Sequence, residues 1–307
     1  SGLPALVKRK IRPPKFAVLL DNETNKKMKY AHCVPVLMYH HVSPAKDMIT
    51  TSPENFERQI AGLAKNGYRA LSTEEFAGFL AGKPVPAKSV LITFDDGYLD
   101  NWVYAHPVLK KYNMLATMFI VTGLIGDGSP RPVAGDAQAL PEMISHKRGK
   151  AMIAAGNTDP VMVRWSEVHA MRQAGTFEFH SHTDTHTRWD LTCATREECL
   201  AKMKLELERS RERLQQQFGT VSEHFCWPQG YFATDYVKLA QDAGFRYLYT
   251  TIAHGQNVSG SDPAHIYRFA VRNRGFYWLR QRIYLAAHPV IGPLYNRWKL
   301  WKRSKRA

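Results

Sequence analysis

Residues 90–98 have the sequence Val-Leu-Ile-Thr-Phe-Asp-Asp-Gly-Tyr, a short apolar run followed directly by two carboxylates. The run at 90–94 predicts a buried β-strand because it is rich in β-branched and aromatic side chains. Asp95 and Asp96 would then stand at the carboxyl end of that strand, where α/β barrels assemble their active sites. One carboxylate can bind a metal while its neighbour acts as a base. The simpler alternative is an acidic turn closed by Gly97.

Similar patterns extend on both sides of this segment. Short apolar runs predict strands at 34–39, 116–121, 176–179, 224–227 and 245–250, and amphipathic or capped segments predict helices at 52–67, 73–80, 165–174, 195–219 and 235–243. Strands that alternate with helices predict a parallel sheet or barrel with right-handed crossovers. Residues 126–160 are rich in Gly, Pro and Ala, and they predict a long loop or a partly helical insertion. Loops of that length are usually functional or mobile.

Two histidines follow another predicted strand. The sequence His182-Thr-Asp-Thr-His186 comes just after the run at 176–179, with His180 two residues before it. Two imidazoles at i and i+4 can converge on one ion if the segment turns helically. Together with one carboxylate they would give a mononuclear site with open positions for water and substrate. A single histidine is more often structural, but this pair combined with Asp95 and Asp96 is a specific signal.

These motifs resemble the polysaccharide deacetylases of the NodB homology type, carbohydrate esterase family 4. The TFDDG pattern of that family is matched at 93–97, its H-[ST]-x-x-H pattern at 182–186, and the resemblance covers about residues 34–272. It implies an α/β fold, a distorted (β/α) barrel. It also implies Asp96, His182 and His186 as ligands of one divalent metal ion and Asp95 as the catalytic base. Zn²⁺ is the expected ion, with Co²⁺ or Ni²⁺ as alternatives.

The later motifs of the family are matched less well. Residues 226–230, Cys-Trp-Pro-Gln-Gly, keep the Pro and Gly of the third motif but have Cys226 where the family usually has an Arg that tunes the base. The resemblance implies the main-chain N–H of Gln229 as the oxyanion donor, a role that does not depend on the side chain. The fifth motif carries the catalytic acid and has only a poor match at 285–288. We interpret His288 as structural. His40, next to a predicted strand end, is the substitute candidate for the acid, with a structural role as the alternative.

The substrate is expected to be an N-acetylated sugar. The resemblance implies hydrolysis of an acetamide in a polysaccharide or a lipid-linked glycan, with release of acetate. Aromatic residues in or near the motif loops could stack on sugar rings, although large aromatics are more often part of the core. Tyr98 and Trp227 are the favoured candidates, and Pro228 and Tyr231 lie beside them in the third motif; Trp102 and Trp165 are further aromatic residues of the same region. A catalytically inactive carbohydrate-binding protein on the same fold is the alternative.

The positive charge of the chain is concentrated at its two ends. The 307 residues include 42 Lys and Arg against 27 Asp and Glu, which gives a net charge of +15. Residues 1–20 carry five basic side chains and residues 263–307 carry eleven, with no acid in either segment, so residues 21–262 have a net charge of −1. A neutral body argues against nucleic acid as a partner, because such proteins place basic patches on the folded recognition surface.

The charge distribution predicts a basic extension at 1–30 and a basic helical tail at 276–307, and the resemblance implies a catalytic domain at 31–275. In the tail, Leu294, Trp298 and Trp301 recur at helical spacing, while Lys299, Lys302, Arg303 and Arg306 occupy the other side; this is the layout of an interfacial helix on an anionic membrane. A solvated helix end is the alternative. With membrane docking, the expected location is the bacterial cell envelope or a membrane surface, as a peripheral protein.

Overall fold

A parallel sheet forms the centre of the molecule. The computed structural model describes residues 29–304 apart from 46 and 48, so nearly all of the predicted extension at 1–30 lies outside the described residues. The main sheet contains β1 (Val36–Tyr39), β4 (Arg69–Ala70), β5 (Ser89–Asp96), β6 (Ala116–Ile120), β7 (Phe177–Ser181), β8 (His224–Cys226), β9 (Tyr247–Tyr249) and β10 (Phe269–Ala270). Its order is β10-β1-β5-β6-β7-β8-β9, with β4 beside β5.

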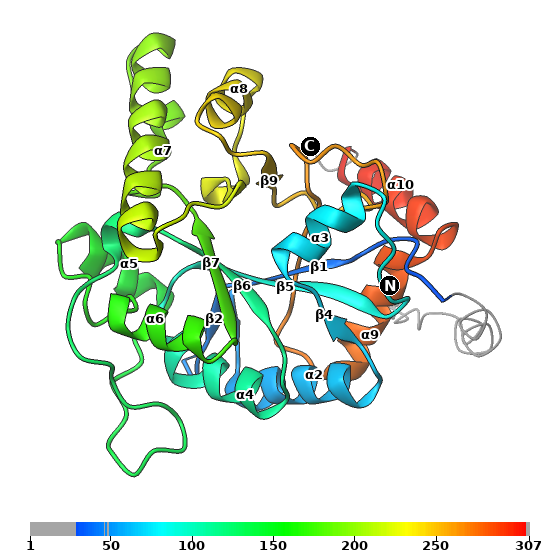
Figure 1. Cartoon of the computed structure of the whole chain (residues 1–307), viewed down its shortest axis with the longest axis horizontal. Coiled ribbons are helices and arrows are strands. Elements are labelled where there is room, and N and C mark those ends of the chain that lie inside the picture. Colours follow the sequence, from blue (N-terminus) through cyan, green and yellow to red (C-terminus); the bar gives the residue numbers. More distant parts are fainter. Residues whose placement is uncertain (1–28, 46, 48, 305–307) are drawn as a thin grey trace, which may run out of the picture.

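Every pairing in this sheet is parallel. The sheet curls into a half-barrel surrounded by helices (Figure 1), which confirms the predicted distorted (β/α) barrel. A separate pair, β2 (His41–Val42) and β3 (Thr50–Thr51), follows β1. β5 is longer than the predicted run and includes both carboxylates, because Asp95 and Asp96 are still in register with Phe119 and Ile120 of β6.

The helices form between the strands. They are α2 (Pro53–Lys65), α3 (Thr73–Leu80), α4 (His106–Lys111), α5 (His146–Ala154), α6 (Trp165–Gln173), α7 (Arg196–Phe218), α8 (Thr234–Asp242), α9 (Phe276–Ala287) and α10 (Ile291–Ser304). Local sequence sets several of their ends. The Ser52 side chain accepts the Asn55 N–H at the start of α2, which has a Pro in its first turn. Gly219, at φ 76°, ends α7 in the left-handed conformation.

The largest hydrophobic cluster anchors the strand that carries the two carboxylates. It fills the space between the sheet and helices that include α2, α4, α6 and α9. Within it, the Phe94 ring stacks on Tyr39 at 5.1 Å and meets the edges of Phe56 and Phe177 at 5.8 and 5.3 Å. Burial of such a side chain contributes about 1.5–3 kcal/mol. The residue directly before Asp95 is therefore fixed on several sides, which holds the end of β5 in place.

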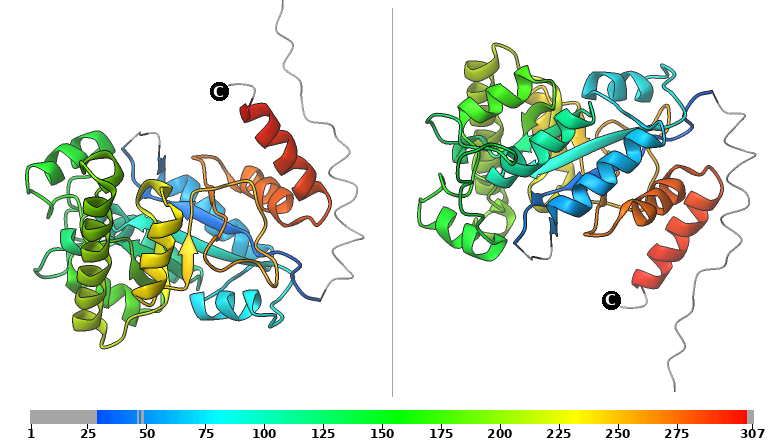
Figure 2. Two further views of the ribbon diagram at one scale, coloured as in Figure 1. Left: turned by 90° about the horizontal axis from the view of Figure 1, so that it is seen from above. Right: turned by 90° about the horizontal axis from the view of Figure 1, so that it is seen from below.

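The two C-terminal helices differ in how they contact the body. Helix α9 packs against α2 and places Leu279 and Ile283 in the main cluster, so it is part of the barrel wall. Helix α10 contacts α9 and stands at the edge of the molecule (Figure 2). Among the described helices, none combines the length and apolar character that crossing a membrane requires.

Candidate metal centre and active site

Three side chains that were predicted as metal ligands converge at the carboxyl end of the sheet. Asp96 Oδ1 lies 3.3 Å from His182 Nε2 and 3.4 Å from His186 Nε2. All three ligand atoms are within 4.8 Å of one another. Asp96 and His182 are buried, whereas the His186 side chain is about a quarter exposed, at 25%. A carboxylate and two imidazoles with one partly open side fit a divalent ion that still has room for other ligands.

Unusual backbone conformations bring these side chains together. The segment from Thr183 to His186 is not helical, so the predicted route to convergence is wrong. Asp96, Thr183 and His186 instead have φ values of 77°, 69° and 63°, in the left-handed region that costs non-glycine residues energy. The turn is closed by the Thr183 hydroxyl, which accepts the His186 N–H at 3.0 Å. The surrounding fold therefore maintains a strained arrangement at the site.

The hydrogen bonds and charges around the cluster suit a metal. His182 Nδ1 donates to the Cys226 carbonyl oxygen at 2.8 Å, so Nε2 is the ring nitrogen that faces Asp96. Burial lowers the pKa of His186 to about 4, so its imidazole is neutral near pH 7. Burial opposes the charge of Asp96, but the two histidines outweigh it and hold the pKa of this carboxyl well below its usual range. The residues present thus fit the ion that the family resemblance implied.

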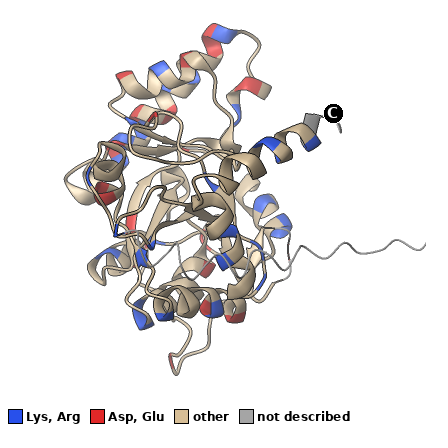
Figure 3. Cartoon of the chain, turned by 90° about the vertical axis from the view of Figure 1, so that its right-hand side faces the viewer, with Lys and Arg blue, Asp and Glu red and all other residues tan. Residues whose placement is uncertain are grey.

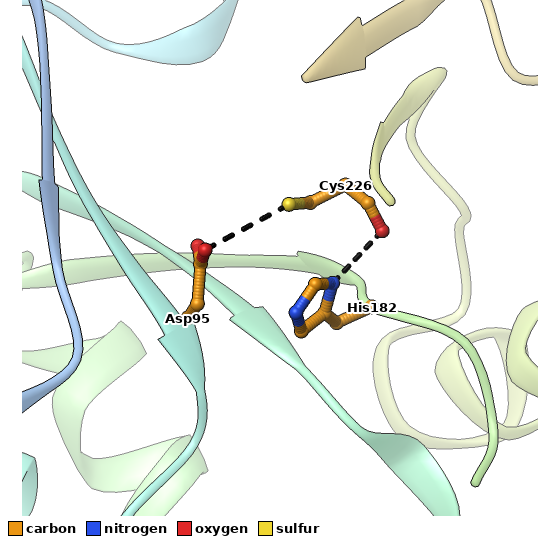
Figure 4. A group of neighbouring side chains, drawn as sticks. All are labelled: Asp95, His182 and Cys226. Carbon is orange, nitrogen blue, oxygen red and sulfur yellow. Dashed lines mark hydrogen bonds between the residues drawn. The ribbon is translucent and has the colours of Figure 1, made fainter. Parts of the chain in front are cut away.

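A second possible donor group overlaps the first. Asp95, His182 and Cys226 also bring ligand atoms within 4.8 Å, and Figure 4 shows the Cys226 sulfur directed toward Asp95 and the Cys226 carbonyl toward His182. The Cys226 Sγ lies 3.9 Å from Asp95 Oδ2 and 3.0 Å from an Arg268 nitrogen. A guanidinium already occupies this side of Asp95 and repels a second cation. The Asp96 group is therefore the better metal site.

Arg268 supplies the cation that the third motif lacks. Its NH1 and NH2 donate to the two oxygens of Asp95 at 2.7 and 2.8 Å, and its Nε donates to the Thr250 carbonyl at 2.8 Å. Arg268 is 1% exposed, and its guanidinium also lies 5.6 Å from the centre of the Phe119 ring. Burial alone would raise the pKa of Asp95, but Arg268 outweighs it and lowers that pKa, so Asp95 is held as a carboxylate. Sequence reasoning counted Arg268 only as part of the basic C-terminal segment.

The candidate site opens into a cavity of about 320 Å³. Its lining includes Asp95, the three candidate ligands, His40, Tyr98, Gln229 and, from helix α5, His146, Lys150, Ile153 and Ala154. Helix α5 belongs to the insertion at 126–160, which was predicted as a loop or partly helical segment. This insertion forms one wall of the site. The participation of His146 was missed, because nothing in the local pattern links residue 146 to the motifs.

The third motif forms a short turn at the cavity. Pro228 begins the 3₁₀ turn Pro228–Gly230, in which Gln229 has a φ of 52°. A Cβ at Gly230 would lie 2.0 Å from the Thr251 hydroxyl oxygen, and the φ there is 71°, so only glycine fits. Gln229 borders the cavity with the candidate ligands, where a main-chain donor is needed for the predicted oxyanion role.

The aromatic residues that were predicted to contact the sugar differ in their exposure to the cavity. Tyr98 borders the cavity but is 6% exposed, and its ring stacks on His41 at 3.8 Å. Trp227 borders the cavity but has no exposed surface, because it packs among Phe225 and other aromatic rings, so the structure lends no support to its predicted stacking on a sugar. Tyr231 does not line the cavity, and the Arg188 guanidinium covers its ring at 4.2 Å.

The two histidines considered as the acid lie far apart in the fold. His40 Nε2 is 3.9 Å from Asp95 Oδ2, and burial lowers the pKa of His40 despite that carboxylate. His288 borders a different cavity, beside Cys33 and Ile283. Its Nδ1 accepts the Val290 and Ile291 N–H groups at 3.2 and 3.1 Å, at the start of α10. This contact supports the structural interpretation of His288.

Comparisons with known proteins agree with the motifs. The family model described as polysaccharide deacetylase matches residues 82–248. The chain is 25% identical over 284 residues to the poly-beta-1,6-N-acetyl-D-glucosamine N-deacetylase of Staphylococcus aureus (strain N315), covering 85% of this chain and 87% of that protein. It is 45% identical over 94 residues to YxkH of Bacillus subtilis (strain 168), a match that spans 30% of this chain and only 33% of that relative. IcaB from Ammonifex degensii has the same fold, with a TM-score of 0.64, 22% identity and coverage of 83% and 98% of the two chains.

Proposed function

Because this chain belongs to the polysaccharide deacetylase family, we propose that it hydrolyses the acetamido group of an N-acetylated glycan to a free amine and acetate. The observation that carries the proposal is that two groups of residues lie in one cavity. One is the Asp96, His182 and His186 cluster, and the other is Asp95 held by Arg268. The staphylococcal relative is named for a polymer of N-acetylglucosamine, which supports such a polymer as the substrate class.

We propose a single divalent ion at the cluster, Zn²⁺ in the first place and Co²⁺ or Ni²⁺ as alternatives. Asp96, His182 and His186 would hold it. An ion bound there lowers the pKa of water toward about 7 and polarises an amide carbonyl. The family and the donor set support a metal, and the choice among these ions is part of the proposal.

The residues around the cluster would carry the rest of the reaction. Asp95 accepts the proton of the attacking water, and Arg268 keeps it ionised by donating to both of its oxygens. The negative charge that develops on the substrate oxygen is stabilised by the Gln229 N–H at the rim of the cavity. The amine that leaves needs a proton, for which His40 was the candidate from sequence.

The alternative of an inactive carbohydrate-binding protein has less support. This alternative was based on the departures from the third and fifth motifs. For the third motif, Arg268 supplies the missing guanidinium from another segment. The staphylococcal relative is named as a deacetylase rather than as a binding protein. These observations favour a hydrolase over a binding protein.

Acetate release tests the proposal directly. The purified chain, loaded with Zn²⁺, is expected to release acetate from N-acetylglucosamine oligomers, and a chelator should abolish turnover until the metal is restored. Removal of a metal that generates the nucleophile removes the main source of rate enhancement. Tight binding of the oligomer without any acetate release, under every metal tested, would favour the inactive alternative.

We further propose that the protein works at the bacterial cell envelope, in peripheral contact with an anionic membrane. Support comes from α10, where Leu294, Trp298 and Trp301 are 59%, 47% and 55% exposed. In Figure 3 the ribbon of this helix, which leads to the C-terminus, carries the colour of Lys and Arg, and residues 291–304 include no Asp or Glu. Lys299 and Lys302 lie over the Trp298 ring at 5.3 and 4.9 Å, so these two cations lie beside an exposed ring and not on the opposite side of the helix as predicted. A lipid-linked glycan would then be an alternative substrate to a free polymer.

A further inference from the structure

Helix α5 presents one of its faces to the active-site cavity. His146, Lys150, Ile153 and Ala154 line the cavity, and they stand at positions i, i+4, i+7 and i+8 of this helix. Residues at this spacing share one face of an α-helix. This face of α5 is therefore a wall of the cavity. The proposed roles of the metal centre and of Asp95 use none of these four side chains.

Close packing holds this wall in place beside the motifs. A Cβ at the buried Gly149 would lie 3.0 Å from Val161 Cγ1, so the helix backbone rests directly on its neighbour. Apolar side chains of α5 pack on the buried cluster that contains Val161 and Tyr98. Nδ1 of His146, the first residue of the helix, lies 3.2 Å from His41 Nε2 and 3.4 Å from the Tyr98 hydroxyl. The side chains on the cavity face of α5 therefore have fixed starting points.

Lys150 brings a positive charge to the cavity that no acid of the lining balances. It is the only Lys or Arg among the described residues that line the cavity. The two acids of the lining are engaged elsewhere, because Asp95 is bonded to Arg268 and Asp96 faces the two candidate histidine ligands. Within the part of the chain that the structure describes, Lys150 forms no ion pair. Its ammonium is available to a bound group.

The Lys150 ammonium is near the inner part of this wall. Burial and the charge of His41 lower the pKa of His146, and Lys150 lowers it further, while Asp96 and Asp47 act in the opposite direction. The charge of Lys150 therefore acts close to the His146 ring. Lys150 is exposed, so its long side chain can turn to a bound group without breaking an existing contact.

We propose that Lys150 binds an anionic group, a carboxylate or a phosphate, that the glycan carries next to its acetamido group. The inference rests on the proposed N-deacetylation and narrows its substrate from any N-acetylated glycan to an acidic one. Substituents on the ring carbons that flank the acetamido group, and the sugars attached there, enter the cavity with it. An ammonium binds either anion through charge-assisted hydrogen bonds, as a point charge without a planar preference. Lys150 repels a glycan that already carries free amines.

The exposure of Lys150 sets the size of the effect. Exposed ion pairs are worth little, because water and salt screen them and because a lysine side chain loses rotamer freedom when it is held. We therefore expect a change of about fivefold, which corresponds to the upper end of exposed pairs. Lys150 touches neither the candidate ligands nor Asp95 in the described structure, so the change belongs to KM rather than kcat.

Oligomers of different charge test the inference in the metal-loaded full chain. Acetate release is measured for a neutral N-acetylglucosamine oligomer, a hyaluronan oligomer that carries carboxylates, an N-acetylglucosamine oligomer with a phosphate on its reducing end, and a partly deacetylated oligomer with free amines. Lys150→Gln should lower kcat/KM about fivefold on the acidic oligomers, through KM, and change it less than about twofold on the neutral one. The same variant should raise kcat/KM on the oligomer with free amines. The ratio of variant to wild type within each substrate cancels differences in linkage.

Two further variants isolate the charge at this position. Lys150→Arg should keep the wild-type pattern, because it keeps the positive charge. Lys147→Gln is the matched control, because Lys147 is an exposed lysine of the same helix that does not line the cavity. Salt at about 0.5 M should reduce the difference between wild type and Lys150→Gln on the acidic oligomers, because it screens the attraction.

The outcomes separate this inference from the proposed function. A loss confined to the hyaluronan oligomer or to the phosphorylated one supports the inference and identifies the anion. Equal losses on every oligomer would show that Lys150 is structural, and acidic oligomers that respond no differently from the neutral one, or that the wild type does not hydrolyse, would overturn the inference alone. A wild-type chain that releases acetate from none of the oligomers would overturn the proposed function itself, and this inference with it. Bound metal and melting temperature, measured for every variant, report on folding.

Discussion

Arg268 reaches Asp95 from a position 173 residues away in the chain, and it contacts Cys226, the residue that stands where the family usually has Arg. We expect Arg268→Met to lower kcat/KM for deacetylation at least about tenfold, because loss of the guanidinium raises the pKa of the buried Asp95. A base with a raised pKa is ionised only at higher pH. The acidic limb of the pH profile should therefore move to higher pH, which steady-state assays between pH 5 and 9 would detect.

Restoring the cation from the motif position gives a sharper test of the same idea. Cys226→Arg combined with Arg268→Ala should recover part of the activity lost in Arg268→Ala, because the two side chains point to the same oxygen of Asp95. Arg268→Lys should retain less activity than the wild type, because the lysine ammonium lacks the planar arrangement of donors that binds both Asp95 oxygens. An unaltered pH profile in Arg268→Met, with full metal content, would contradict the role of Arg268.

At the level of single residues, sequence identified groups that are close in a motif and missed those that tertiary structure brings in. Asp95, Asp96, His182 and His186 come together as their spacing after two strands suggests. Arg268 and His146 had no local signal, because each contacts its partner across more than 100 residues. A motif position does not say which way the side chain of Trp227 faces, and this ring faces the core.

Strand β7 and its neighbour β8 carry a second group of buried histidines, outside the proposed site. His180 contacts the Thr73 and Ser222 hydroxyls at 3.2 and 2.5 Å, and His224 contacts the Tyr249 hydroxyl at 2.9 Å. Burial lowers the pKa of His180 to about 3 and that of His224 well below its usual value. Both histidines are therefore neutral in the folded protein near pH 7.

The lowered pKa values of these two histidines predict that the folded protein loses stability in acid. Between about pH 6.5 and pH 3 the unfolded chain binds a proton at His180 and the folded chain does not, so stability is full above this window and falls as pH is lowered through it. The free energy of unfolding should drop by up to about 1.4 kcal/mol per pH unit for each such histidine. His180→Gln is expected to flatten this slope in urea unfolding of the metal-free protein between pH 7.5 and 4.5. The exposed His169→Gln should keep the wild-type slope, and an equal slope in both variants would refute the assignment.

Among the larger elements, sequence predicted those with clear periodicity. Helices α2, α3 and α6 and strands β1, β6 and β7 lie within a few residues of the predicted ranges. β10 was missed because two residues, Phe269 and Ala270, have no detectable period, yet this strand pairs with β1 and follows Arg268 directly. Helix α5 was not resolved within a segment rich in Gly and Pro. The short elements without periodicity are thus the ones that bring Arg268 and His146 to the site.

In the molecule as a whole, the residues of the proposed site and most of the excess positive charge lie in different segments of the chain. Residues 21–262, which hold the metal ligands and the base, have a net charge of −1, while residues 263–307 carry eleven basic side chains and no acid. Arg268 shows that this C-terminal charge has more than one use, because it is buried and neutralised by Asp95. The cations of α10, in contrast, lie at the edge of the molecule beside exposed rings. The cations of α10 are not needed to bind an uncharged acetamido sugar. Their position therefore favours a role in placing the protein at a membrane surface.

A variant of α10 tests that role without shortening the chain. Trp298→Glu with Trp301→Glu should abolish sedimentation with vesicles rich in phosphatidylglycerol, because it removes apolar insertion and adds two negative charges next to Lys299 and Lys302. Acetate release from water-soluble oligomers should be unchanged. Wild-type binding should weaken with salt, since each basic residue near the surface contributes about 1 kcal/mol and the attraction is screened. Tyr277→Glu, on α9 and 65% exposed, is the matched control for adding charge at an exposed ring. Equal vesicle binding by the wild type and the α10 variant would show that this helix is simply a solvated end of the chain.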